Sequence, residues 1–205
     1  MLLCDAYLPL KIKNSRLWQL FRGENAISIK LQNSFMSNAN PLKFATCDLC
    51  DAHKNDASGN FRVLPPVFKD FGKHTKFCGE VVTIKCFEDN SLVKTAVDSP
   101  GVGRVLVVDG GASLRRALLG GNLGAAAATN GWAGVVIDGC VRDVAELALS
   151  AVGIRALAAM PLPTEKRGEG QRDVAVQIQG VWVRPGDWLY ADEDGMVVMP
   201  APTTT

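Results

Sequence analysis

The sequence predicts a single-domain α/β protein with a parallel βαβ unit and a β-rich C-terminal part. Two apolar runs, 104–111 and 133–139, each end in Asp-Gly and have the composition of strands that are buried on both faces. An alanine-rich stretch of strong helix propensity lies between them. After residue 173, short β-branched runs alternate with turns that contain glycine. Strand, helix and strand in this order indicate parallel strands joined by a crossover helix.

Composition limits the classes of protein that this chain can belong to. Its 205 residues, 47% of them hydrophobic, are enough to bury one core. No apolar run is long enough to span a bilayer. The net charge of +1 gives no general attraction to nucleic acid or to acidic membranes. We therefore expect a cytoplasmic protein that binds neither nucleic acid directly nor a membrane.

Residues 1–40 differ from the rest and are interpreted as an irregular N-terminal extension, with the folded domain at 41–205. Residues 1–35 carry five basic and two acidic side chains, a net charge of +3. Such a basic start is typical of a transit segment for import into an organelle. The alternative is that Met36 is the working start. We favour the second interpretation, because a globular pattern begins only after Pro41.

The first expected element is a helix that begins near Thr46, with Thr46 as its cap and with Leu49 and Cys50 facing inward. Cys47 and Cys50 form a C-x-x-C motif, with His53 and His74 downstream, as some zinc or redox sites have. No second C-x-x-C is present, so inert buried thiols are the favoured interpretation.

The remaining elements follow in order. We expect strands at 77–87, 104–111, 133–139, 154–160, 174–178, 181–183, 188–190 and 196–199, helices at 92–97 and 123–130, and a polar loop at 166–173. A further helix is expected to begin at Asp143. Its apolar stripe would consist of Val144, Leu147, Ala148 and Ala151, and Gly153 would end it.

Arg142 and Asp143 follow an apolar strand directly, where open α/β sheets usually bind their ligands. A guanidinium can hold a carboxylate substrate, and a neighbouring carboxylate can hold a hard cation such as Mg²⁺. The pair therefore predicts an enzyme that acts on small oxo-acids. Two alternatives remain: Asp143 and Glu146 fit a capping box, and Arg142 fits a solvated surface charge.

The run from Gly120 through Gly121, Asn122 and Leu123 leads into the alanine-rich helix. Glycines let the backbone approach a ligand, and a helix N-terminus offers N–H groups to an anion. The run fits neither a Walker loop nor G-x-G-x-x-G, and a purely structural turn is the alternative. The run starts the crossover helix of the βαβ unit, and the second strand of the same unit ends just before Arg142. The two features are therefore expected to face each other.

Other acidic residues have simpler interpretations. Asp109 and Asp138 lie at strand ends and are expected to bond the turn that follows. The acidic run at 191–195 could chelate a cation, but a solvated hairpin turn is favoured.

Several blocks together carry a resemblance to a known family. They lie at 46–51, 82–90, 103–111, 120–122, 130–134, 139–143, 153–156 and 186–192. From about Thr46 to Met199 the chain resembles the regulator of ribonuclease activity A (RraA-like) family, which also contains 4-hydroxy-4-methyl-2-oxoglutarate aldolases. The resemblance implies a swivelling β/β/α sandwich. It also implies a homotrimer or a dimer of trimers, with sites at subunit boundaries.

The resemblance also implies a chemistry. Such aldolases are divalent-metal-dependent lyases that release pyruvate from 4-hydroxy-2-oxo diacids, with oxaloacetate decarboxylase as a side activity. By this resemblance, the backbone of Gly120, Gly121, Asn122 and Leu123 holds the substrate carboxylate. Arg142 steadies the oxo-acid, and Asp143 binds the metal, Mg²⁺ or Mn²⁺. Lys166 could add positive charge.

The family offers an alternative from another class, a non-catalytic inhibitor of an RNase E-type endoribonuclease. That branch typically lacks the aspartate after the strand-end arginine, so Asp143 favours the enzyme. Two departures count the other way. Gly121 stands where many aldolases have an acidic residue, and the chain ends soon after Pro200, where they continue to a further carboxylate. A slow aldolase, or one shifted toward decarboxylation, is the expected consequence.

Overall fold

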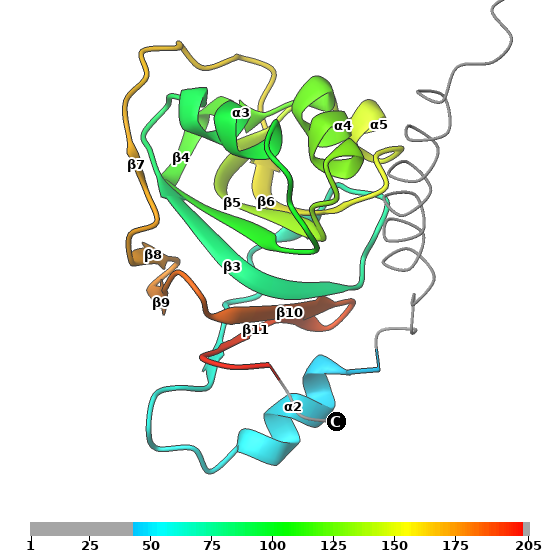
Figure 1. The fold of residues 1–205 in the computed structure, drawn as a ribbon, viewed down its shortest axis with the longest axis vertical. Helices are drawn as coiled ribbons and strands as arrows, with labels where there is room; N and C mark the ends of the chain where they lie inside the picture. The colour runs from blue at the N-terminus through cyan, green and yellow to red at the C-terminus, as the bar shows by residue number, and fades with distance from the viewer. Residues whose placement is uncertain (1–42, 203–205) are drawn as a thin grey trace, which may run out of the picture. The chain divides into compact units, whose positions relative to one another are not determined.

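A computed structural model describes residues 43–202, and these residues form a mixed α/β domain, as predicted (Figure 1). The predicted extension at 1–40, with its transit-segment and Met36 interpretations, lies outside the described residues. In the described part of the chain, no helix is long and apolar enough to cross a membrane.

Within residues 43–202, nine strands form one mixed sheet in the order β1-β11-β10-β3-β4-β5-β6-β2, with β7 paired to β3. β3 connects the two halves of this sheet. Its first half pairs antiparallel with β10, and its second half pairs parallel with β4. β4, β5 and β6 continue in parallel, so the predicted βαβ unit is confirmed. The strands are β1 (Arg62–Val63), β2 (Lys69–Asp70), β3 (Phe77–Lys85), β4 (Val105–Leu119), β5 (Gly134–Val141), β6 (Gly153–Ala159), β7 (Gln171–Arg172), β10 (Trp188–Asp192) and β11 (Gly195–Met199), and β8 (Val176–Ile178) pairs separately with β9 (Val181–Val183).

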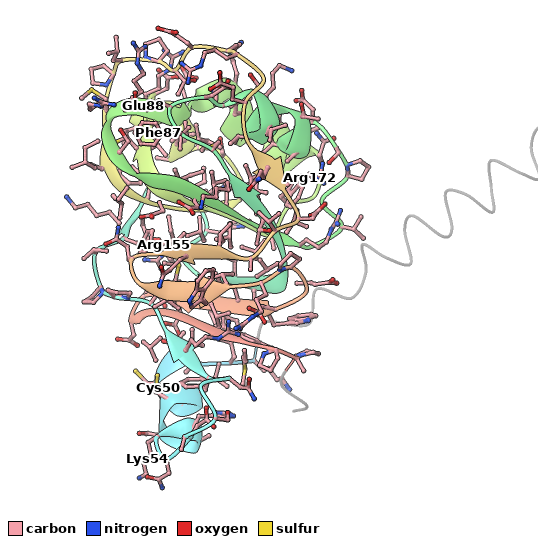
Figure 2. All side chains as sticks on the ribbon, turned by 90° about the vertical axis from the view of Figure 1, so that its left-hand side faces the viewer. Cys50, Lys54, Phe87, Glu88, Arg155 and Arg172 are labelled. Carbon is pink, nitrogen blue, oxygen red and sulfur yellow. The ribbon has the colours of Figure 1, made fainter. Side chains whose placement is uncertain are left out.

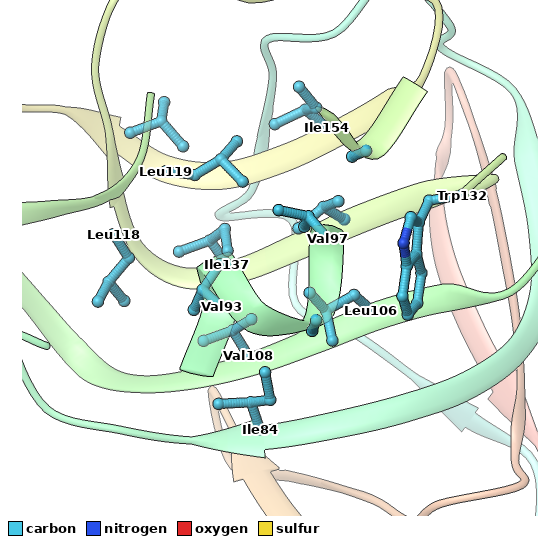
Figure 3. Packing of buried hydrophobic residues seen from close by; sticks show 14 of the residues in the cluster. Ile84, Val93, Val97, Leu106, Val108, Leu118, Leu119, Trp132, Ile137 and Ile154 are labelled. Carbon is cyan, nitrogen blue, oxygen red and sulfur yellow. The ribbon is translucent and has the colours of Figure 1, made fainter. Parts of the chain in front are cut away.

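Three layers result, in agreement with the β/β/α sandwich that the resemblance implied. Helices α3 (Ser91–Val97), α4 (Gly121–Thr129) and α5 (Val144–Leu147) cover one face of β3–β6 (Figure 1). Ile84, Leu106 and Ile137 pack beneath them in an apolar cluster (Figure 3). A second cluster, which includes Val107 and Leu189, fills the opposite face under β8–β11. Every residue of β5 is buried, which explains why its sequence is apolar except for Asp138.

Close packing on Phe77 explains two strand-start glycines. A Cβ atom at Gly134 would lie 2.3 Å from the Phe77 ring, and one at Gly153 would lie 2.1 Å from it. Gly153 is therefore the first residue of β6 and does not end a helix, contrary to the prediction.

The first helix, α2 (Thr46–His53), begins where the sequence predicted but is capped differently. Ala45 is the N-cap, so the prediction of Thr46 as cap was wrong. Instead, Asp192 of β10 accepts the Thr46 backbone N–H at 2.7 Å and its hydroxyl at 2.5 Å. Because only the side of α2 that faces β10–β11 is covered, Cys47 is exposed and Cys50 half-buried. The prediction of two buried thiols was therefore wrong for Cys47.

The helix predicted from Asp143 is much shorter than its apolar stripe suggested. α5 ends at Leu147, which is buried, whereas Val144, Ala148 and Ala151 are exposed. After Leu147 the chain turns through Ser150 toward β6, and within residues 43–202 the rest of the stripe stays exposed.

Candidate active site at the ends of β4 and β5

A pocket of about 310 Å³ lies where β4 and β5 end. Five of the six predicted site residues line it: Gly120, Asn122, Leu123, Arg142 and Asp143. Gly121 is not among the lining residues. The rest of the lining is Asn90, Lys94, Ala117, Pro163, Thr164 and Lys166.

The parallel sheet brings the two predicted features together. Leu119, the last residue of β4, is paired with Val141, the last residue of β5. The next residues, Gly120 and Arg142, therefore leave neighbouring strands at the same edge, and the Arg142 backbone N–H donates to the Leu119 carbonyl at 2.9 Å. The glycine-rich turn and the charged pair share this edge, as expected from the sequence. Both strands run further than predicted, β4 to Leu119 and β5 to Val141.

Asp143 is held by α4 rather than by its own helix. It has φ 57° and ψ 45°, a left-handed conformation that aspartate tolerates better than most residues. Its Oδ2 accepts the Gly121 backbone N–H at 3.1 Å and lies 3.4 Å from Arg142 Nε. Its side chain makes no capping hydrogen bond to α5 in the described structure, so the capping-box alternative is not formed.

Gly120 and Gly121 leave room for side chains from the β5–α5 connection. A Cβ at Gly120 would lie 2.7 Å from Asp143 Oδ2 and 3.1 Å from Arg142 Nε. A Cβ at Gly121 would lie only 1.8 Å from Glu146 Oε2. The Glu146 carboxylate therefore occupies the space beside residue 121, where many aldolases were expected to carry an acidic side chain.

The pocket has the electrostatic character of an anion site. Its lining includes three basic residues, Lys94, Arg142 and Lys166, and one acidic residue, Asp143. The side chains of Arg142 and Asp143 are each 39% exposed, so both can be reached by a ligand. Lys94 also forms an ion pair with Asp98, which is outside the pocket lining. In the first turn of α4, the Gly121 N–H donates to Asp143 and the Leu123 N–H donates to the Gly120 carbonyl at 3.0 Å, which leaves the Asn122 N–H for a ligand.

Asn90 and Lys94 are site residues that sequence reasoning missed. Asn90 follows β3, the strand beside β4, and its Nδ2 donates to the Leu118 carbonyl at 3.2 Å. Asn90 belongs to the Glu88–Asn90 turn at a strand end, and that position was the available signal. Pro163 and Thr164 carried no comparable signal, because they lie on a polar loop distant in sequence.

The donor set of the pocket fits a magnesium ion better than zinc. Among residues 43–202, no three His, Cys, Asp or Glu side chains gather as metal ligands. Zinc sites usually need three or four such ligands, whereas Mg²⁺ is commonly held by one or two carboxylates together with water and substrate oxygens. Asp143 supplies one exposed carboxylate of this kind.

The other predicted acidic groups lie outside the pocket lining. Asp109 accepts the Gly111 backbone N–H at 3.0 Å, as predicted. Asp138 instead accepts Gln179 Nε2 at 2.7 Å, and its burial raises the pKa of its carboxyl. Asp192 in the acidic hairpin is 4% exposed, so the hairpin prediction was right but this residue is not solvated.

The C-x-x-C motif also lies away from this site. Figure 2 shows Phe87 and Glu88, just before Asn90, at the end of the domain opposite to Cys50 on α2 and Lys54, which follows α2. The cysteines thus have no place in the pocket.

Known proteins are similar to this same part of the chain. The model of the RraA-like family, described as Aldolase/RraA, matches residues 46–198. A relative from Albidiferax ferrireducens, named "Putative 4-hydroxy-4-methyl-2-oxoglutarate aldolase", is 79% identical over 163 residues, 76% of this chain and 94% of its own. One of the same name from Cupriavidus necator is 57% identical over 158 residues, 77% and 96% of the two chains. The solved structure of the RNA-processing inhibitor RraA from Thermus thermophilis is 47% identical, with a TM-score of 0.75 over 80% of this chain and 96% of its own.

Proposed function

This chain belongs to the RraA-like family, and from that premise we propose that it is a divalent-metal-dependent lyase that cleaves 4-hydroxy-4-methyl-2-oxoglutarate to release pyruvate. The observation that carries the proposal is the joint placement of Arg142, Asp143 and the N-terminus of α4 in one pocket. The names of the two aldolase relatives support the same reaction class.

Arg142 and the start of α4 bind the pyruvyl part of the substrate. The guanidinium presents several N–H donors to a carboxylate or an oxo oxygen. The first N–H groups of α4 and its dipole attract the same negative charge. Gly120 lacks a side chain, so Arg142 and Asp143 can lie close to the start of α4.

Asp143 holds the metal, Mg²⁺ or Mn²⁺, through its exposed carboxylate. The bound cation supplies Lewis-acid stabilisation of the negative charge that develops on the substrate oxygen as the carbon–carbon bond breaks. Arg142 stabilises the same charge through preorganised N–H donors. Loss of CO₂ from oxaloacetate leaves the same charge on the same oxygen, and we therefore propose oxaloacetate decarboxylation as a side activity.

A second candidate function is inhibition of an RNase E-type endoribonuclease through protein–protein contact. The likeness to the RNA-processing inhibitor RraA favours it. For either function we propose a homotrimer or a dimer of trimers. A pull-down tests this candidate. The immobilised chain should retain such an endoribonuclease more strongly than an unrelated immobilised protein does.

The deciding experiment measures pyruvate release from both oxo-acids with Mg²⁺, with Mn²⁺ and with excess chelator, for the wild type, Asp143→Asn and Asp143→Ala. Asparagine keeps an oxygen that can accept the Gly121 N–H, but it lacks the charge that holds a cation. Alanine loses both functions. Removal of a cap costs about 0.5–2 kcal/mol.

We expect chelator-sensitive turnover in the wild type and a loss of more than about 10³-fold in both variants, since electrostatic stabilisation of this kind supplies several kcal/mol. Only Asp143→Ala should also lose thermal stability. Wild-type turnover in Asp143→Asn would show that Asp143 is a helix cap alone. An inactive wild type would favour the inhibitor.

A further inference from the structure

Asp89 is a buried carboxylate with an unusual set of partners. It lies between β3 and α3 and is 0% exposed. Its Oδ2 accepts the backbone N–H of Arg167 at 2.7 Å and that of Glu169 at 3.1 Å. Between them, the Gly168 N–H donates to Ser91 Oγ at 3.2 Å. Three successive N–H groups of one loop thus converge on the 89–91 turn, the arrangement of an anion-binding nest.

The remaining contacts of Asp89 hold the 89–91 turn itself in place. Its Oδ1 accepts the Ser91 backbone N–H at 2.8 Å, and an isolated β-bridge pairs Asp89 with Glu165. Burial by itself raises the pKa of the Asp89 carboxyl. The hydrogen bonds from Ser91, Glu169 and Arg167 outweigh this effect, and the pKa lies well below its usual range. Asp89 therefore stays ionised and bound to the loop at neutral pH.

The loop that Asp89 holds forms one wall of the candidate active site. Pro163, Thr164 and Lys166 line the pocket. The loop is fixed at its start, where Ala117 N–H donates to the Leu162 carbonyl at 2.8 Å, and at its end, where β7 pairs with β3. Asp89 binds it between these points, directly after Lys166.

We propose that Asp89 is a positioning residue of this pocket, which acts by holding the 163–170 loop so that Lys166 faces the bound oxo-acid. The proposal rests on the proposed function for the role of Lys166 in substrate binding. The anchoring of the loop stands on the hydrogen bonds alone. Asn90, the next residue, lines the same pocket. The 89–91 turn therefore supplies one lining residue and holds the loop that supplies Lys166.

Asp89→Asn tests the anchoring, because the amide keeps the size of the side chain and loses its charge. Trypsin cleaves after Lys166 and Arg167, and cleavage of the native protein there reports opening of the loop. We expect cleavage at these bonds to be at least about tenfold faster in Asp89→Asn than in the wild type, since proteolysis tracks the open population. Asp187→Asn is the matched control: its carboxylate is also buried and accepts a backbone N–H, that of Arg184 at 2.8 Å, but it lies outside the loop and the pocket lining, and cleavage after Lys166 and Arg167 should stay at the wild-type rate.

Kinetics with Lys166→Met then tests the coupling. We expect Asp89→Asn to raise KM for the oxo-acid by about 10- to 100-fold, with a smaller change in kcat, because a misplaced binding group weakens substrate positioning. If Asp89 acts through Lys166, the double variant should have a KM no higher than that of Lys166→Met. If the increases in KM of the two single variants multiply in the double variant, Asp89 does not act through Lys166. If trypsin cleaves Asp89→Asn at the wild-type rate, Asp89 does not anchor the loop.

Gly168→Val gives a second route if Asp89→Asn does not fold. Gly168 has φ +77°, a conformation that valine disfavours, and its Cβ would meet no atom within 4 Å. This variant should open the loop without disturbing the core. Unchanged proteolysis of Gly168→Val would count against the nest. An inactive wild type with faster proteolysis of Asp89→Asn would refute the proposed function and still support the anchoring.

Discussion

Gly120→Ala should displace the Arg142–Asp143 pair without changing its chemistry. The backbone of Gly120 has φ −132°, which alanine adopts freely. The new Cβ would lie 2.7 Å from Asp143 Oδ2, whereas ordinary contacts of this kind begin at 3.4 Å, so restoring an ordinary contact moves the carboxylate by about 0.7 Å. Arg142 Nε, at 3.1 Å, would have to move by a few tenths of an ångström. A displacement near 1 Å can cost about 10²-fold in rate, so we expect kcat/KM to fall by about 10- to 100-fold.

The assay is pyruvate release with Mg²⁺, together with thermal unfolding. The loss of glycine at the N-cap and of a half-exposed hydrogen bond to Asp143 should cost about 1–2 kcal/mol, or a few degrees in Tm. Ala125→Gly is the matched control. It weakens the same helix by about 1 kcal/mol at an exposed position outside the pocket lining. Equal activity of Gly120→Ala and Ala125→Gly would refute the assignment of the pair, and Gly120→Ala should have no further effect in an Asp143→Asn background.

Two further predictions concern neighbouring carboxylates. Gly121→Asp should destabilise the fold by about 1–3 kcal/mol through overlap with Glu146. Combining it with Glu146→Ala should recover most of the lost stability in urea unfolding. Additive losses in the double variant would contradict the overlap. Thr46→Val removes a buried donor to Asp192 and should cost about 1.5–3 kcal/mol at pH 7. Burial raises the pKa of Asp192, but its hydrogen bonds from Thr46 lower it overall. This stabilisation is therefore present above the unfolded pKa of about 3.9 and is lost as the pH falls below it, so the two unfolding curves should converge in acid.

The sequence predicted those parts of the fold that depend on local pattern. β5 was recognisable because all of its residues are buried, and the glycines before α4 marked a helix start. The predictions failed where a distant segment decides the outcome. Asp192 replaces the expected Thr46 cap across 146 residues. α5 ends at Leu147, and no element among residues 43–202 covers the rest of its stripe. Propensity carries no information about such partners.

In the candidate site, too, residues set by local pattern were predictable and those placed by a distant segment were not. Arg142 and Gly120 were predictable because parallel strands end at one edge of a sheet, so residues that follow neighbouring strands meet there. The loop with Lys166 could not be placed in this way, because its position depends on Asp89, a residue that sequence alone marked only as part of a turn.

The conformation of Asp143 links the structural and the catalytic interpretations of the pair. A left-handed residue after a strand turns its side chain back toward α4, and there Gly121 and Arg142 fix one carboxylate oxygen, Oδ2. In the proposed metal site, the other oxygen, Oδ1, would be the donor to the cation, since a hard cation needs only one such carboxylate oxygen beside water and substrate. Under that proposal, capping of α4 and metal binding would use different oxygens and need not compete. The contact with α4 would then hold the Asp143 carboxylate in place for the metal.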